Sequence, residues 1–307
     1  MFMFVIRRLL VSIMVVLASV TLVFFILNVL PGNPAEMMLG PNATPETLQN
    51  LNESLGLNKS LLVQYFDYMR GFLKGDLGES FITKKPVIDQ LLAQLPATLS
   101  LAGASIAIAV ILGMVLGVLS AVYQNKAIDY VVRMISLFSI SMPTFWLGIL
   151  LILIFSVHLQ WLPAIGNGSL RQLILPACCL GIASAGSLSR LVRNSVLEVL
   201  NEQFVVTLRA KGLPEKLVLC KHVLRNALIP TVTMIGIVAG ELLSGAVVTE
   251  TVFSRQGIGR VVVEAIMQKD IPLVQAAILI AAIFYIIVNL LVDISYTYID
   301  PRIRSKH

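Results

Sequence analysis

The residue types that perform catalysis are present in this sequence, but they do not stand at spacings that support it. The three histidines, His158, His222 and His307, lie far apart in the chain. Two of the three cysteines, Cys178 and Cys179, are adjacent within an apolar run, where we expect small packing residues. No GxxxxGKS/T phosphate loop, HExxH metal motif or GxSxG nucleophile elbow occurs. We therefore predict a chain that is not an enzyme and holds no cofactor or metal of its own.

The densest group of charged side chains lies in residues 190–227, which we call the basic loop. Its first helix is expected to end at Gly212, which readily adopts the left-handed conformation. Pro214 then begins a second helix, with Glu215 in its positively polarised first turn. Each helix carries an apolar stripe, Leu197, Leu200, Phe204 and Leu208 in the first and Leu217, Cys220, Leu224 and Leu228 in the second. Such a stiff helix–glycine–helix element either inserts into a groove on a partner or lies on anionic lipid.

Glu241 is the single acid in an otherwise apolar run. A carboxylate in hydrocarbon costs a few kcal/mol, so it should face protein or water. Its side chain either lines a translocation path or couples protons, or it is a buried carboxylic acid bonded to a neighbouring helix. The sequence leaves these alternatives open.

Composition places these residues in a membrane protein. Hydrophobic residues make up 57% of the 307 residues and charged residues 13%, against about 25% charged in a soluble domain. Six apolar runs are long enough to span a bilayer, or nearly so. They are Leu9–Leu30, Pro96–Tyr123, Met134–Val157, Leu173–Ser189, Leu228–Thr249 and Ile271–Val292. The first run exceeds the usual length of a signal-peptide core, so we expect it to be retained.

The distribution of Lys and Arg predicts the topology. With the N-terminus inside, fourteen basic residues fall in the inner segments, against four in the two short outer loops. Both termini are therefore predicted to be cytoplasmic. The net charge of +6 is then mostly a topology signal, and no nucleic-acid partner is expected, because the basic loop is tied to the bilayer at both ends.

The long outer segment, residues 31–95, is predicted to be helical. Thr44 can cap a helix that begins at Pro45 and ends before Gly56, and a second amphipathic stretch covers Leu61–Phe72. A third leads from Pro86 into the second span. We expect a small helical cap, which serves either as a docking surface or gate lid or as a structural cover.

Small residues recur four apart in several spans and predict close helix packing. They are Gly113 and Gly117, Gly181, Ala185 and Ser189, and Gly236 and Gly240.

Short motifs occur in a fixed order along almost the whole chain. They are Leu30-Pro31-Gly32-Asn33-Pro34, Leu55-Gly56-Leu57, Gly75-Asp76-Leu77-Gly78-Glu79-Ser80, Ser141-Met142-Pro143, Trp161-Leu162-Pro163, Leu175-Pro176, Ala210-Lys211-Gly212, His222-Val223-Leu224-Arg225-Asn226-Ala227, Gly257-Ile258-Gly259-Arg260 and Asp300-Pro301-Arg302. In this order the chain resembles the permease subunits of binding-protein-dependent ABC importers, in the dipeptide/oligopeptide/nickel group. Asn33 departs from the aspartate that is usual there.

The resemblance implies an all-α membrane protein with six transmembrane helices, the type I ABC importer permease fold and a small helical outer segment. The implied parts are an N-terminal tail and first helix (1–30), the outer segment (31–95), a five-helix core with the basic loop (96–300) and a cytoplasmic tail (301–307). It also implies a bacterial inner membrane location, a second homologous permease subunit and two ATPase subunits that bind ATP and Mg. A periplasmic or lipid-anchored solute-binding protein would deliver the cargo.

The resemblance further implies that the basic loop is a coupling loop seated on an ATPase subunit. In the family's loop motif, Gly212 fills the glycine position and Leu224 the leucine position, whereas His222 and Arg225 replace the usual isoleucine and proline. Val206, Thr207 and Leu208 stand where the family has Glu-Ala-Ala. The implied coupling residues are Arg209, Ala210, Lys211, Gly212, Leu213, Glu215, His222, Leu224 and Arg225.

Peptides are the first expected cargo, with nickel, a metal chelate or glutathione as alternatives. Two other classes compete with an ATP-driven importer. An ion- or proton-driven secondary transporter would use Glu241, and an intramembrane enzyme would need paired catalytic groups in the spans, which the sequence does not contain.

Overall fold

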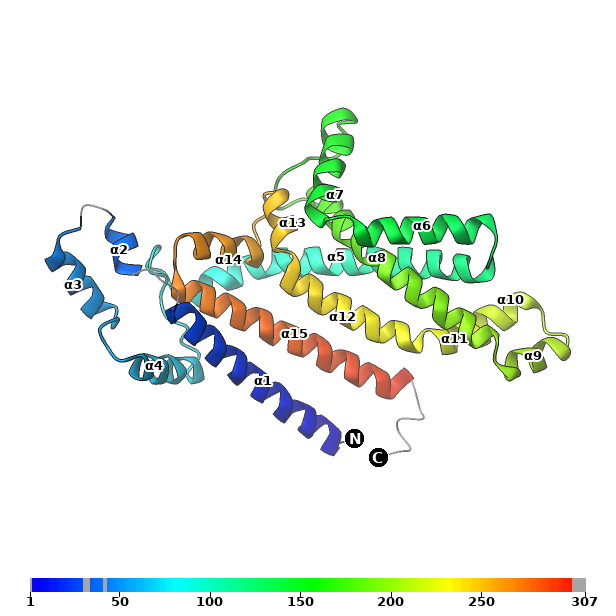
Figure 1. The fold of residues 1–307 in the computed structure, drawn as a ribbon, viewed down its shortest axis with the longest axis horizontal. Helices are drawn as coiled ribbons and strands as arrows, with labels where there is room; N and C mark the ends of the chain where they lie inside the picture. The colour runs from blue at the N-terminus through cyan, green and yellow to red at the C-terminus, as the bar shows by residue number, and fades with distance from the viewer. Residues whose placement is uncertain (1, 30–33, 41–42, 300–307) are drawn as a thin grey trace. The chain divides into compact units, whose positions relative to one another are not determined.

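Apolar helices make up most of the chain, in the order that the apolar runs predict (Figure 1). The structure, a computed structural model, describes residues 2–29, 34–40 and 43–299. The predicted motif residues 30–33 and 300–302 and the predicted tail 301–307 lie outside these ranges.

Four helices in the described residues are each long and apolar enough to cross a membrane. They are α1 (Phe2–Val29), α5 (Val87–Val122), α8 (Leu170–Leu200) and α15 (Ile271–Ile299). They contain the first, second, fourth and sixth predicted spans. The fourth span is longer than predicted, because α8 continues without a break past Arg190 into the basic loop.

The third predicted span, Met134–Val157, is not a straight helix. Helix α6 (Ala127–Ser141) meets α7 (Thr144–Leu151) and its π-helical continuation η1 (Ile152–His158) at 107°. The bend lies at Met142, whose backbone is extended (φ −81°, ψ 129°). Pro143 follows it, and a residue before proline avoids the helical region.

The fifth predicted span is carried by α12 (Ile229–Gly245) and α13 (Val247–Val252). The helical segment Glu215–Ala227 meets α12 at 52°. Pro230 lies in the first turn of α12, where proline is accepted. In a continuous helix that ran from Glu215 through α12, Pro230 would remove a hydrogen bond and clash with the preceding turn. In the described residues, four predicted spans therefore correspond to continuous helices and the third to a bent pair, whereas the bend near the fifth span lies just before its start.

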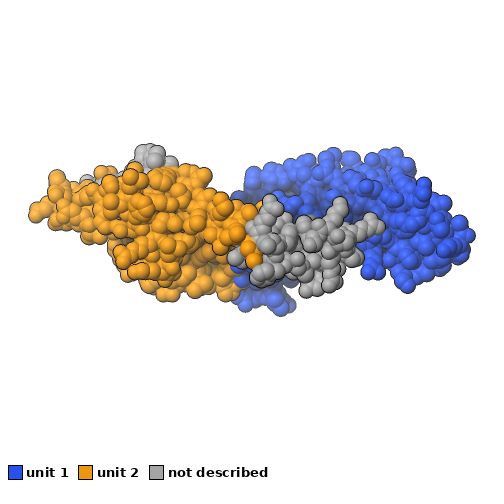
Figure 2. All heavy atoms as spheres, turned by 90° about the horizontal axis from the view of Figure 1, so that it is seen from below, with its two compact units in different colours: residues 1, 99–255, 287–307 blue, residues 2–98, 256–286 orange. Residues whose placement is uncertain are grey.

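The chain divides into two compact units, each built from segments distant in sequence (Figure 2). The first unit comprises residues 1, 99–255 and 287–307, and the second comprises residues 2–98 and 256–286. Helix α5 contributes to both, because the division falls between residues 98 and 99.

Small residues let the helices of the first unit pack closely. A Cβ atom on Gly117 of α5 would lie 2.7 Å from both the Ser189 carbonyl oxygen and the Cβ of Val192 on α8. A Cβ atom on Gly181 of α8 would lie 2.6 Å from Cγ2 of Ile108 on α5. Real Cβ contacts are not this short, so glycine is required at both positions. The predicted packing role of these residues on α5 and α8 is confirmed.

The second unit has a core of its own, formed by the start of α5, by α14 (Ile258–Met267) and by the start of α15. Its fully or nearly fully buried side chains are Val87, Leu91, Ile258, Ala265, Leu273, Val274, Ala276 and Ala277. The Thr98 hydroxyl accepts a hydrogen bond from the Ile258 amide (2.9 Å) at the first residue of α14. Asp270, buried just before α15, accepts from the Ser80 hydroxyl and from the Phe81 amide (3.1 Å).

The outer segment is helical, as the sequence predicts. It contains α2 (Pro34–Leu39), α3 (Pro45–Ser54) and α4 (Leu61–Leu73). The Thr44 hydroxyl accepts from the Thr47 amide (3.3 Å) at the start of α3, and Gly56 follows the helix with φ +69°. Both predicted helix ends are thus confirmed.

Candidate functional site

The basic loop continues directly from α8 as a chain of short helices at one end of that helix (Figure 1). It contains α9 (Gln203–Ala210), α10 (Glu215–Leu217), the π-helical η2 (Val218–Val223) and α11 (Leu224–Ala227), which leads into α12. A rigid-body displacement of this loop would therefore act directly on two membrane helices.

Gly212 produces the turn between α9 and α10. Its φ is +76°, and its amide donates to the Arg209 carbonyl (2.9 Å) while the Leu213 amide donates to the Leu208 carbonyl (3.3 Å). No atom lies within 4 Å of the place that a Cβ would occupy, so glycine is required here for its backbone conformation and not for space. The predicted left-handed helix end is confirmed.

An ion pair crosses the same turn. Arg209 donates from Nε to Glu215 Oε2 (3.1 Å) and from Nη2 to Glu215 Oε1 (2.6 Å). The hydrogen bond from Arg209 lowers the pKa of Glu215, and the same bond raises the pKa of Arg209. Both side chains are substantially exposed, so the pair contributes at most about 1 kcal/mol to stability. Its two parallel bonds nevertheless restrict the geometry of the turn.

A small apolar core lies beneath the turn and joins the basic loop to α8. Val205, Val218 and Val223 are fully buried against Val192 and Val196 of α8. Partly buried leucines surround this core, namely Leu197, Leu200, Leu208, Leu213, Leu219 and Leu224. The basic loop is thus packed directly against α8.

The predicted apolar stripes do not coincide with the face that is buried within this chain, because Phe204, Leu217 and Cys220 are exposed. The helix ends at Leu200 and restarts at Gln203, which shifts the buried face of α9 to Val205. In the second helix the π-helical hydrogen bonds connect residues five apart, so the buried pair is Val218 and Val223.

The other predicted residues lie on or near the surface of the basic loop. Ala210, Lys211 and Arg225 are exposed. His222 is half-buried, and its carbonyl accepts from the Asn226 side-chain amide (2.9 Å). The exposed surface around the Gly212 turn therefore carries basic groups.

Glu241 belongs to a different part of the first unit. It lies on the exposed face of α12, one turn after the exposed Ile237. Within this chain it is therefore not a buried carboxylic acid. The structure does not bring it together with the basic loop.

A buried acid that the sequence reasoning missed lies next to the basic loop core. The Asp129 carboxylate is inaccessible to solvent and accepts from Arg193 Nε (2.9 Å) and Nη2 (3.0 Å), from the Ser120 hydroxyl (2.6 Å) and from the Asn125 amide (2.9 Å). These bonds tie the α5–α6 connection to α8. Ala121, which follows Ser120, and Val192, which precedes Arg193, both belong to the apolar core beneath the Gly212 turn.

Among the described residues, no group of three or more His, Cys, Asp or Glu side chains is placed to hold a metal ion. The arrangement presents an exposed surface that carries basic groups and is joined through packed side chains to α8.

Comparison with known proteins identifies the family of the chain. The chain matches the binding-protein-dependent transport system inner membrane component over residues 113–305, and the N-terminal part of such membrane components over residues 1–102. The chain belongs to this permease family. The permease is 40% identical over 326 residues to the dipeptide transport system permease protein DppB of Alkalihalophilus pseudofirmus, covering 97% of the permease and 98% of that protein. It is 41% identical over 303 residues to the glutathione transport system permease protein GsiC of Escherichia coli K12, covering 99% of each.

The fold of the permease is similar to a chain of the MetNI methionine ABC transporter, solved in inward-facing conformations. The TM-score is 0.60 at 19% sequence identity, and the match covers 69% of the permease and 97% of that chain. The predicted fold class, an all-α membrane protein of the type I ABC importer permease fold, is confirmed.

Proposed function

We propose that this permease and a second homologous permease subunit form the pathway through which an ATP-driven importer moves peptides across the membrane. The observation that carries the proposal is the full-length similarity to a dipeptide permease and a glutathione permease. Because glutathione is itself a tripeptide, both relatives are named for small peptides. We therefore place di- and oligopeptides first and glutathione second. No relative described above is named for nickel or a metal chelate.

The energy for transport would come from partner proteins. Two ATPase subunits would bind ATP and Mg, and a periplasmic or lipid-anchored solute-binding protein would deliver the cargo. The permease would lie in a bacterial inner membrane with both termini cytoplasmic, as the distribution of basic residues predicts.

We further propose that the basic loop seats on an ATPase subunit and transmits its movement. The left-handed turn at Gly212 and the Arg209–Glu215 pair support this role, because they stiffen the tip of the loop. The fully buried valines beneath the tip make the loop move with α8. The contacts would be made by Arg209, Ala210, Lys211, Gly212, Leu213, Glu215, His222, Leu224 and Arg225.

Glu241 would face the pathway or the second permease. It lies on the exposed side of α12, and exposure of a carboxylate to acyl chains would cost a few kcal/mol. A water-filled pathway or a polar partner surface removes that cost. This position also makes Glu241 the residue on which a proton-driven alternative depends.

Two experiments test the proposal. Gentle purification from the native membrane should yield a second permease and ATPase subunits in stoichiometric amounts. Uptake of a labelled dipeptide should require the permease gene, should stop on ATP depletion and should survive a protonophore while ATP is maintained. Excess unlabelled glutathione and nickel then rank the cargoes by competition. Uptake that follows the proton gradient and is lost in Glu241→Gln would instead support the secondary transporter.

A further inference from the structure

Helix α4 is attached to the side of α1 through aromatic side chains. Tyr65 packs against Phe24 and Phe25 with ring centroids 5.4 and 5.5 Å apart, and Tyr68 stacks on Phe24 at 5.6 Å. The hydroxyls of Tyr65 and Thr21 are hydrogen-bonded at 2.8 Å. Helix α4 is therefore held at the level of the Thr21–Phe25 turn of α1.

That level lies inside the apolar part of α1. The span candidate covers Leu10–Leu27, so Thr21 is six residues, or about 9 Å, before its carboxyl end. With the apolar part of α1 across the bilayer, a helix bound at this level would lie beside the hydrocarbon boundary and not above it in bulk water. Tyrosine is favoured at such boundaries, since its ring is apolar and its hydroxyl polar.

The outward side of α4 carries an apolar stripe, which the exposed Arg70 borders. Leu62, Phe66 and Leu73 are 63%, 67% and 76% exposed. At 100° per residue they fall within an arc of about 40° on the helix. Among the described residues of the second unit, no element covers this stripe sufficiently to bury any of the three side chains.

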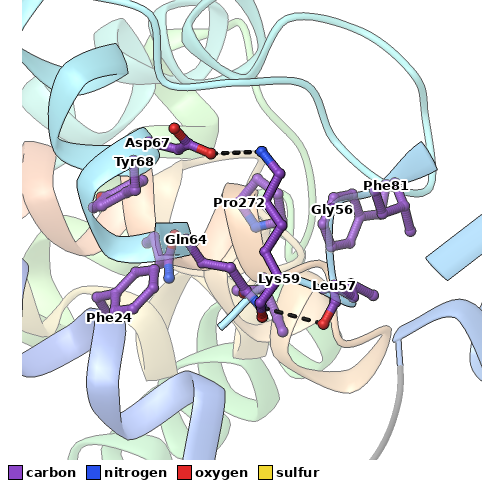
Figure 3. Close-up of a pocket in the computed structure, with 12 residues that line it drawn as sticks. Phe24, Gly56, Leu57, Lys59, Gln64, Asp67, Tyr68, Phe81 and Pro272 are labelled. Atoms are coloured by element: carbon purple, nitrogen blue, oxygen red, sulfur yellow. Dashed lines mark hydrogen bonds and ion pairs between the residues drawn. The ribbon is translucent and has the colours of Figure 1, made fainter. Parts of the chain in front are cut away.

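The opposite side of α4 is polar. Gln64, Asp67 and Tyr68 line a cavity of about 210 Å³ whose other walls include Phe24, Phe81 and Pro272 (Figure 3). Asp67 forms an ion pair with Lys59 (2.7 Å) at this cavity. Helix α4 thus presents its apolar stripe outward, while the side that carries Gln64, Asp67 and Tyr68 packs against its own unit.

We infer that α4 lies in the leaflet at the carboxyl end of α1, with Leu62, Phe66 and Leu73 in contact with phospholipid acyl chains. Under the proposed topology this is the outer leaflet. The outer segment is therefore anchored in the bilayer at α4, which limits its freedom to act as a swinging lid. A surface for the solute-binding protein would leave the stripe facing water whenever that protein is absent, and the depth of the α1 contact argues against this.

The test places the photo-crosslinking residue p-benzoyl-phenylalanine at position 66, in the full complex in its native membrane. Leu22, which is exposed within the α1 span, is the matched lipid-facing position, and Asn50, which is exposed on α3, is the matched water-facing position. After irradiation, intact-mass measurement of the purified permease detects adducts. Positions 66 and 22 should both gain the mass of one phospholipid, and position 50 should not. Position 73 provides a second probe of the stripe.

Two results would overturn the inference. One is a crosslink from positions 66 and 73 to the solute-binding protein or another subunit in place of lipid. The other is an unmodified permease at both positions while position 22 gains lipid. Neither result bears on the importer assignment, which the co-purification and uptake experiments test separately.

Discussion

The buried ion pair between Asp129 and Arg193 offers the sharpest test of how the membrane helices are held beside the basic loop. Replacing Asp129 with alanine removes the acceptor of both Arg193 hydrogen bonds and of the bonds from Ser120 and Asn125. It also leaves a guanidinium that is only 16% exposed without its counter-ion. We therefore expect Asp129→Ala to destabilise the permease strongly.

The expected size follows from the burial of the two partners. Removing one partner of a buried ion pair costs about 3–5 kcal/mol. Arg193 retains a little contact with solvent, so the lower end, about 3 kcal/mol, applies. At about 2.1 cal/mol/K of unfolding entropy per residue, 1 kcal/mol corresponds to about 1.6 °C in the Tm of a 307-residue chain, so the midpoint should fall by about 5 °C. Arg133, the second arginine near Asp129, is 43% exposed at 3.4 Å, and its pair should be worth less than about 1 kcal/mol.

The assay is a double-mutant cycle on the purified complex at fixed pH and salt. Thermal unfolding is measured for Asp129→Ala, for Arg193→Met and for the double variant, with Arg133→Met as the matched control. The double variant should be more stable than the sum of the single losses predicts, because no unpaired charge remains buried. Single losses below about 2 °C, or losses that simply add, would show that the two side chains are not coupled.

Three further predictions concern single positions. Gly212→Val should lower uptake per ATP hydrolysed at normal expression, because a positive φ costs a β-branched residue about 1–2 kcal/mol. Gly212→Asn should lower this ratio less. Equal ratios for wild type and both variants would contradict the role of this turn. Arg209 depresses the pKa of Glu215, so the stabilising pair is present above the unfolded pKa and is lost only as pH falls through the lower folded value. Wild type should therefore keep its ratio of uptake to ATP hydrolysis from neutral pH down to about pH 5, whereas Glu215→Gln should have a lower ratio throughout. A fall in the wild-type ratio at a pH above the ordinary glutamate pKa of about 4.3 would refute this. Gly117→Ala should cost about 1–3 kcal/mol of stability by overpacking, which is measured as a lower Tm. Gly103→Ala on the same helix should leave the Tm unchanged, because the space around Gly103 is open. Equal decreases in Tm for the two variants would argue against the close α5–α8 contact.

Features that depend on neighbouring residues could be predicted from the sequence. The spans, the Thr44 cap on α3 and the left-handed turn at Gly212 all follow from apolar run length, a capping hydroxyl or the freedom of glycine. The small-residue stripes on α5 and α8 also predicted close packing correctly, although not which atoms meet.

The buried face of the basic loop could not be read from helical periodicity. A break after Leu200 and the π-helical η2 change the phase, so the residues buried within the chain are Val205, Val218 and Val223, whereas Phe204, Leu217 and Cys220 of the apolar stripes are exposed. Packing against α8 selects this phase, which cannot be derived from the sequence of the segment alone. The bend at Pro143 is a similar case, since proline permits a break but its 107° angle depends on the surrounding helices.

The sequence by itself determined that this chain is an all-helical membrane permease with a stiff basic loop, because hydropathy, helix caps and ordered motifs depend on residues that are close together in the chain. Only the tertiary structure decided that Asp129 meets Arg193 sixty-four positions later, that Glu241 is exposed on α12 and that α4 presents an apolar stripe beside the span of α1. These features arise from contacts between helices, whose partners and angles are fixed by the packing of the whole unit and not by any one segment.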